Sequence, residues 1–167
     1  MEKYSFLKTR VLFMCLGNDA RSPMAEAWLN HLYGDQFEAR SAGLEPGVIH
    51  PLAVKVMQEV GLDLSSHIPH RVFDLVKEGE LFSYAITLWD QGRNERPAYF
   101  PGFCIRLKWP FSDPAKVACS AEQQLENMRG LRDALKDKIE GWVEQLKAGR
   151  PTFLHRQSEK FLRALAK

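Results

Sequence analysis

The stretch 10–24 reads RVLFMCLGNDARSPM, and it decides the architecture of the chain. Its first six residues form a short apolar run rich in β-forming side chains, which is typical of a buried strand. Gly17 and Asn18 then indicate a turn. Ser22 and Pro23 follow as a helix N-cap and a proline at the first helical position. This stretch therefore predicts a strand, a tight loop and a helix in direct succession.

The rest of the chain continues this alternation of strands and helices. Further apolar, β-rich runs predict strands over residues 37–42, 83–89 and 103–109. Apolar residues that recur every three or four positions predict helices over residues 22–33, 51–60 and 121–147. Strands that alternate with helices become parallel neighbours joined by right-handed crossovers. The sequence therefore predicts an α/β sandwich.

The length and composition fit one globular domain. The chain has 167 residues, of which 45% are hydrophobic and 26% charged, and a chain of this size buries roughly 70% of its unfolded surface. Its three cysteines form no C-x2-C pair, which argues against a secreted disulfide scaffold or a zinc module. The apolar stretches are too short to cross a membrane, and no signal peptide is expected. These features predict a cytoplasmic protein.

Charge is distributed unevenly along the chain. Residues 150–167 carry five Lys or Arg and one Glu, a net charge of +4, whereas residues 1–149 carry −2. The body thus lacks the basic stripe that nucleic-acid binding needs. We predict a domain over 1–149 and a basic amphipathic tail over 150–167. The tail would form a terminal helix whose apolar face packs on the domain, or contacts a membrane or a partner; that face holds Phe153, Leu154, Phe161, Leu162 and Leu165.

Cys15 and Arg21 enclose the loop between the first strand and the first helix. A loop of this length, with Gly17 and Asn18 inside it, can curl around a tetrahedral oxyanion so that successive backbone N–H groups point inward. The following helix adds its positive dipole end, and the Arg21 guanidinium can donate to two oxygens at once. The sequence predicts an oxyanion-binding loop of seven residues: Leu16, Gly17, Asn18, Asp19, Ala20, Arg21 and Ser22.

The same positive field favours ionisation of Cys15. We expect its pKa to fall well below the value of about 8.5 for a free thiol, with the Ser22 hydroxyl donating to the sulfur as well. The alternative is a structural cysteine at a strand end with a surface arginine nearby, since this spacing alone often arises by chance. The strand–turn–helix context favours the functional interpretation.

The stretch VLFMCLGNDARSPMAE (11–26) closely resembles the active-site loop of the low-molecular-weight protein tyrosine phosphatases, whose fold is shared by the arsenate reductases of the thioredoxin-coupled type. The resemblance covers about residues 10–146. It continues through SAGLEPG (41–47), HPLAVKVMQEVGLDLSSH (50–67), AITLWD (85–90) and WPFSDPAK (109–116), which look more like the reductases. It implies a three-layer sandwich with a four-stranded parallel sheet, and a catalytic role for the domain over 1–149.

The resemblance also implies roles for individual residues. Cys15 would be the nucleophile, Arg21 the oxyanion clamp and Asp113 the general acid, while Asn18 and Ser22 would support the loop. A carboxyl group opposite the thiolate makes chemical sense, because a leaving oxygen must receive a proton. The Asp-Pro pair at 113 alone would indicate only a turn or a helix start. Its place between the fourth strand and the last long helix, where the family carries its acid, favours the catalytic role.

Departures from the family pattern concern the redox chemistry. The phosphatases usually have a second cysteine in the loop, where this chain has Ala20. The thioredoxin-coupled reductases carry two further cysteines, where it has Trp89 and Arg96. After the acid, DPAK replaces the DPYY pattern with which the phosphatases grip an aryl substrate. An internal disulfide cascade is therefore not expected.

The other candidate residues give weaker signals. Cys104 is expected to pack within the fourth strand, and Cys119 lies in a loop from which it could approach Cys15. Four histidines show no metal-ligand spacing and are expected at the surface or as caps: His50, His67, His70 and His155.

These observations predict an enzyme of the arsenate-reductase type. Cys15 would attack arsenate held by the loop and Arg21, and Asp113 would protonate the departing oxygen. An external thiol of the glutathione or mycothiol type would resolve the adduct, with a glutaredoxin-like partner; no bound cofactor or metal is expected. The alternative is a phosphatase that hydrolyses phosphate monoesters such as phosphotyrosine through a cysteinyl-phosphate. A third interpretation is an inactive oxyanion-binding or regulatory module.

Overall fold

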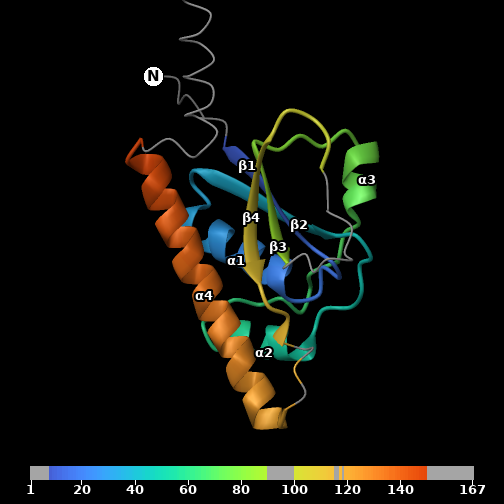
Figure 1. Ribbon diagram of the computed structural model, residues 1–167, viewed down its shortest axis with the longest axis vertical. Coiled ribbons are helices and arrows are strands. Elements are labelled where there is room, and N and C mark those ends of the chain that lie inside the picture. Colours follow the sequence, from blue (N-terminus) through green and yellow to red (C-terminus); the bar gives the residue numbers. More distant parts are fainter. Residues whose placement is uncertain (1–7, 90–99, 115–116, 118, 150–167) are drawn as a thin grey trace, which may run out of the picture.

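The computed structural model describes residues 8–89, 100–114, 117 and 119–149 (Figure 1). The elements follow one another as β1 (Thr9–Cys15), α1 (Arg21–Tyr33), β2 (Phe37–Gly43), α2 (Pro51–Gln58), α3 (Val72–Lys77), β3 (Tyr84–Trp89), β4 (Ile105–Phe111) and α4 (Ala121–Lys147). The four strands form one parallel sheet in the order β2-β1-β3-β4. The predicted fold class is confirmed.

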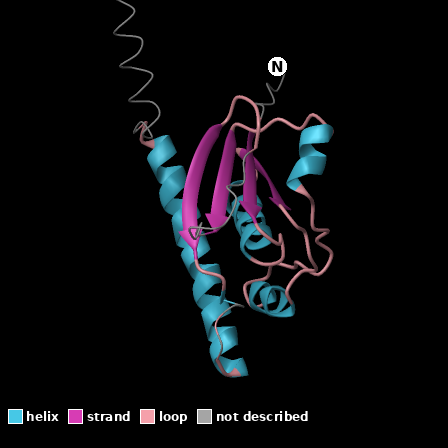
Figure 2. Cartoon of the chain, turned by 45° about the vertical axis from the view of Figure 1, so that its right-hand side comes forward, coloured by secondary structure: helices cyan, strands magenta, loops and turns pink. Residues whose placement is uncertain are grey.

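Helices cover both faces of the sheet and give the three layers (Figure 2). Because side chains alternate across a strand, Val11 and Phe13 of β1 enter a core shared with α1, α2 and α4. Leu12 and Met14 enter a second, smaller core that includes α3. Strand β1 is therefore buried on both sides, as expected of a central strand in a parallel sheet.

The register brings the ends of the strands together. Cys15 is paired with Gly43, and Trp89 with Phe111, so all four strands finish at the same edge of the sheet. The loop after β1 and the segment after β4 that carries Asp113 both begin at this edge, which is where open α/β sheets bind ligands. The topology thus places the candidate site residues in one region.

Two boundaries differ from the sequence predictions. Strand β4 lies two residues later than expected, because it continues through Pro110 to Phe111. A proline cannot donate to a neighbouring strand, but β4 is the edge strand and its outer side has no neighbour in the sheet. The short helix α3 was not predicted; at six residues it is too short to show a helical period.

The predicted tail over 150–167 lies outside the described residues. Within those residues, no helix is both long enough and apolar enough to cross a lipid bilayer.

Candidate active site

Cys15 is the last residue of β1 and is fully buried. Its sulfur lies 2.7 Å from the Ser22 hydroxyl and accepts a hydrogen bond from the Asn18 backbone N–H at 3.2 Å. Ser22 stands on the first turn of α1, so the loop bends back until the helix start meets the strand end. The structure thus brings together the predicted nucleophile and two predicted loop supports.

Asn18 fixes the shape of the loop. Its backbone has a φ of 48°, in the left-handed region that asparagine tolerates better than most residues. Its buried side-chain amide donates to the hydroxyls of Ser22 and Ser41, at 2.9 Å each, and its carbonyl accepts from the His70 backbone N–H at 2.8 Å. Three separate segments therefore hold this one side chain.

The loop is also held from outside through its backbone carbonyls. Those of Cys15, Leu16, Gly17 and Asp19 accept hydrogen bonds from backbone N–H groups within residues 44–50, at 2.8–3.3 Å. In a trans peptide the carbonyl and the next N–H point in opposite directions. The N–H groups that follow these carbonyls therefore point away from residues 44–50, towards the inside of the loop. This is the orientation that an oxyanion-binding loop requires.

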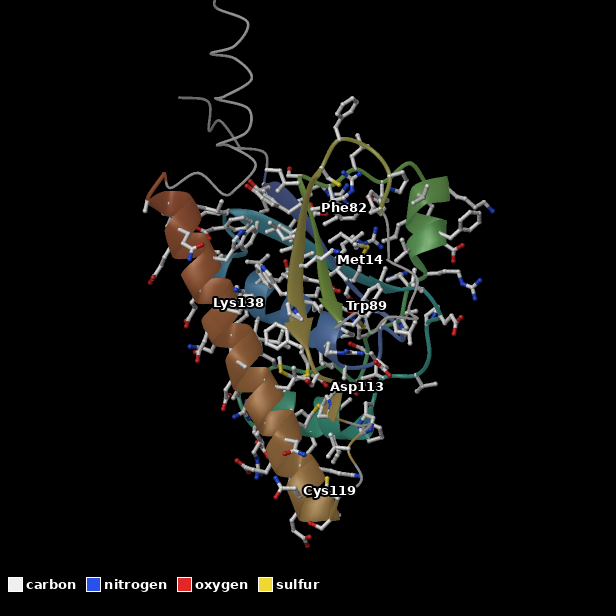
Figure 3. All side chains as sticks on the ribbon, in the orientation of Figure 1. Met14, Phe82, Trp89, Asp113, Cys119 and Lys138 are labelled. Carbon is white, nitrogen blue, oxygen red and sulfur yellow. The ribbon has the colours of Figure 1, made fainter. Side chains whose placement is uncertain are left out.

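Arg21 connects the loop to the segment after β4. Its guanidinium is almost completely buried; Nη1 donates to the Phe111 carbonyl at 3.0 Å, and Nη2 donates to Asp113 Oδ2 at 3.3 Å. Arg21 and Asp113 are 92 positions apart in the sequence, and they form an ion pair. Figure 3 labels Asp113 just beyond the end of β4, towards the N-terminal end of α4.

The role predicted for Ser22 as a helix cap is wrong. The cap position belongs to Ala20, which offers no side-chain hydrogen bond, and Ser22 and Pro23 follow as the second and third helical residues. The Ser22 hydroxyl is instead engaged with Cys15 and Asn18. The helix start is fixed by the loop contacts rather than by a capping side chain.

The predicted direction of the Cys15 pKa shift is also reversed. Burial raises the pKa of the thiol, and the hydrogen bonds with Ser22 and the charge of Arg21 oppose this only in part. Sequence spacing could indicate the nearby cation but not how deeply the fold buries the sulfur, and burial is the largest cause of the shift.

Sequence analysis missed the surroundings of His67. Its Nε2 lies 3.3 Å from the Ser41 hydroxyl, which donates to Glu26 at 2.5 Å. Burial raises the pKa of Glu26, and burial and then nearby His70 lower the pKa of His67. The position of Glu26, one helical turn after Ser22 on α1, was the signal that could have indicated an acidic side chain near the loop. His50 does act as a cap, accepting from the Leu52 N–H at the start of α2.

The other candidate residues lie around the sheet. Trp89 is buried at the end of β3 in the same apolar cluster as Cys15, and Arg96 lies outside the described residues. Cys104 directly precedes β4, at the amino ends of the strands, whereas Cys15 lies at their carboxyl ends. Measured along the strand direction, the two residues are about five residues, or about 16 Å, apart. The Cys119 thiol donates to the Val117 carbonyl beside the start of α4 (Figure 3). Within the described residues, no group of His, Cys, Asp and Glu is arranged to hold a metal ion.

Comparison with known proteins gives a consistent result. The family model for "Low molecular weight phosphotyrosine protein phosphatase" matches residues 10–96. The chain is 33% identical over 138 residues to the arsenate reductase of Halalkalibacterium halodurans, an alignment that covers 82% of this chain and 96% of that protein.

Solved structures agree with the sequence comparison. A structure described as an arsenate reductase in the phosphate binding state superimposes with a TM-score of 0.68 at 28% identity, covering 82% of this chain and 98% of the other. The low molecular weight protein tyrosine phosphatase of T. tengcongensis matches with a TM-score of 0.61 at 25% identity, covering 83% and 99%.

Proposed function

Because the chain belongs to the low molecular weight phosphotyrosine protein phosphatase family, we propose that it is a cysteine-dependent enzyme that reduces arsenate to arsenite. The observation that carries this proposal is the convergence of three groups. The Cys15 thiol touches Ser22 within an oxyanion-shaped loop, and Arg21 and Asp113 meet at the mouth of that loop. The identity to the H. halodurans arsenate reductase favours arsenate as the substrate.

The first step joins the Cys15 sulfur to arsenic. Arsenate, a tetrahedral oxyanion, is held by the inward N–H groups of the loop and by the Arg21 guanidinium. The thiol passes its proton to an arsenate oxygen as the sulfur attacks, and the bond between arsenic and a hydroxyl oxygen breaks. Asp113, in its protonated form, gives its proton to the departing oxygen, which leaves as water. The product is a Cys15-arsenate thioester with arsenic still in its +5 state.

An external thiol completes the reduction. Its sulfur attacks the Cys15 sulfur of the adduct, so the arsenic–sulfur bond breaks and its electron pair stays on arsenic. Arsenite leaves with arsenic in its +3 state, and a mixed disulfide remains on Cys15. A second thiol releases Cys15 as a thiol and becomes a disulfide with the first. We propose a glutathione- or mycothiol-type thiol and a glutaredoxin-like partner for these steps.

The surroundings of Cys15 support an external rather than an internal reductant. Trp89 presents a buried indole where the thioredoxin-coupled relatives are expected to carry a thiol, and Ala20 has no redox chemistry. Cys104 lies at the opposite edge of the sheet. Cys119 is the remaining thiol, in the segment before α4.

The test is arsenate-dependent thiol oxidation with a panel of reductants. Turnover with glutathione or mycothiol plus a glutaredoxin should exceed turnover with thioredoxin and its reductase, and should persist in a Cys104→Ser/Cys119→Ser double variant. A Cys15→Ser variant is the control and should fall to background. Thioredoxin-only turnover that disappears in the double variant would contradict the external-thiol route.

A phosphatase is the second candidate, favoured by the buried Trp89 at the position of a resolving thiol. The same attack on a phosphate monoester would give a cysteinyl-phosphate that water hydrolyses. Hydrolysis of a small aryl phosphate, measured beside arsenate reduction, separates the two activities. If neither exceeds the Cys15→Ser control, the protein is an oxyanion-binding module instead.

A further inference from the structure

The long helix α4 carries a groove on the side that faces the edge strand β4. Three cavities of about 690, 320 and 360 Å³ follow one another along it. The first lies against Asp113, the second under Leu107 and Trp109 of β4, and the third at the last turn of the helix. The α4 residues in the groove recur every three or four positions and so share one helix face: Gly130, Ala134, Asp137, Gly141, Gln145 and Ala148.

Two glycines on this face are unexplained by the described packing. A Cβ atom at Gly130 or at Gly141 would meet no heavy atom within 4 Å in the structure. Glycine destabilises the interior of a helix relative to alanine, so its use at two such positions needs a reason. Close approach of another segment to this face supplies one.

We propose that residues 150–167 fold back and occupy the groove along α4. Helix α4 ends at Lys147, and Gly149, just after the cap residue Ala148, has a φ of 62°, the left-handed conformation that turns the chain away from the helix axis. Pro151 follows and cannot continue the helix. The segment thus leaves α4 at the end of the groove that lies beside Ala148.

The length of the segment matches that of the groove. From Ala148 back to Gly130 the helix spans about 27 Å at about 1.5 Å per residue. Residues 152–167, which have the apolar spacing of a helix, would cover about 24 Å in that conformation. The end of the segment would therefore reach the cavity beside Asp113.

The charges of the segment and the groove are complementary. The segment has a net charge of +4. The acidic residues Glu126, Asp137 and Glu144 line the groove. Among the described residues that line it, the one basic side chain is Lys138, whose ammonium lies over the Trp109 ring. A second copy of the domain is a poorer occupant, because residues 1–149 carry a net charge of −2 and two such domains repel each other.

The proposal also accounts for a difference from the relatives. The aligned region leaves about a fifth of this chain without a counterpart in the H. halodurans protein, which is itself almost fully covered. The resemblance to the family ends near residue 146, where α4 ends. The segment over residues 150–167 therefore lies beyond the region of resemblance, whereas nearly all of α4 lies within it.

The test follows the backbone amide signals of Gly130 and Gly141 by NMR in the full-length protein. The variant Phe161→Asp/Leu162→Asp places two carboxylates on the apolar face of the segment, and Ala166→Asp is the control that adds a carboxylate away from that face. The double variant should shift both glycine signals, and the control should leave them in place. Trypsin should cleave the double variant after Arg156, Lys160 or Arg163 at least about tenfold faster than the wild type.

A chain ending at Gly149, with the peptide 150–167 added separately, provides the second measurement. The peptide should restore the wild-type glycine signals, and a Gly141→Phe variant should block this restoration at Gly130. Unchanged glycine signals in the full-length double variant would overturn the proposal, whether or not the shortened chain folds. Signals that shift with protein concentration, together with a dimer in sedimentation, would overturn it in favour of a second copy.

Discussion

The two sides of the site around Cys15 are held in different ways. On one side, the loop over residues 15–22 is fixed by the Asn18 side chain and by four backbone carbonyls that are bonded to residues 44–50. On the other, Asp113 follows the edge strand β4 and forms an ion pair with Arg21. Backbone hydrogen bonds therefore hold the segment that carries the nucleophile, whereas an ion pair between two side chains joins the acid to that segment.

Replacing Asp113 by Asn should give the largest effect. Loss of a general acid typically lowers the rate by about 100-fold or more, and we expect kcat for arsenate reduction to fall by about that factor. Glu126→Gln, which removes another carboxylate from the neighbouring cavity, is the control and should keep kcat within about twofold. Near-normal turnover by Asp113→Asn would remove it from the proposed mechanism.

Gly43→Ala tests the rigidity of the loop side. A Cβ at this position would lie 2.8 Å from the Leu16 carbonyl oxygen and 2.9 Å from the Asn18 nitrogen, both backbone atoms that cannot move aside easily. We expect the free energy of unfolding to fall by about 2 kcal/mol, as for other overpacked sites. Urea unfolding measures this, with Gly47→Ala as the control, because a Cβ there would meet only the Gly17 carbonyl oxygen, at 4.0 Å. An unchanged midpoint for Gly43→Ala would show that the loop adapts.

Arg21→Lys tests the group that joins the two sides. Lysine keeps the charge but cannot contact two oxygens in a plane, nor reach Phe111 and Asp113 together in the same way. We expect kcat/KM to fall at least about tenfold, which corresponds to about 1.4 kcal/mol of transition-state stabilisation. A lysine variant with nearly normal kcat/KM would contradict the two-pronged contact.

The smallest effect should come from Asp19→Asn, which changes one charge near the thiol. The Asp19 carboxylate raises the pKa of Cys15, so its removal should lower that pKa, and Ser22→Ala should raise it by removing a hydrogen bond that lowers it. The rate of iodoacetamide alkylation against pH reads both shifts. Because burial raises the pKa of Cys15, the wild-type rate should increase mainly above the ordinary thiol range, and an inflection at acidic pH would contradict this.

The sequence predicted the features that depend on neighbouring residues. The apolar run before Cys15, the turn residues Gly17 and Asn18, and the spacing along α4 are local signals. Each element that was predicted lies within a few positions of where it was expected. The loop residues could be identified for the same reason, because they are contiguous.

Features that depend on distant residues were not predictable in this way. The direction of the Cys15 pKa shift depends first on burial, which the surrounding elements impose, and the contact of Arg21 with Asp113 joins residues 92 positions apart. The contact of His67 with Ser41 depends on where the fold places β2. The continuation of β4 through Pro110 depends on the position of β4 at the edge of the sheet. Local spacing carries no information on such placements.

The four outward-bonded carbonyls have a consequence for binding. A loop whose backbone is already tied to residues 44–50 has little conformational entropy left to lose when an oxyanion enters. Association should then proceed without a slow ordering step, and inorganic phosphate, which has the same tetrahedral shape as arsenate, should enter as readily. The enzyme would therefore bind its oxyanion quickly. Discrimination between arsenate and phosphate would have to come from the later reduction step, because only arsenic accepts the electron pair of its bond to sulfur.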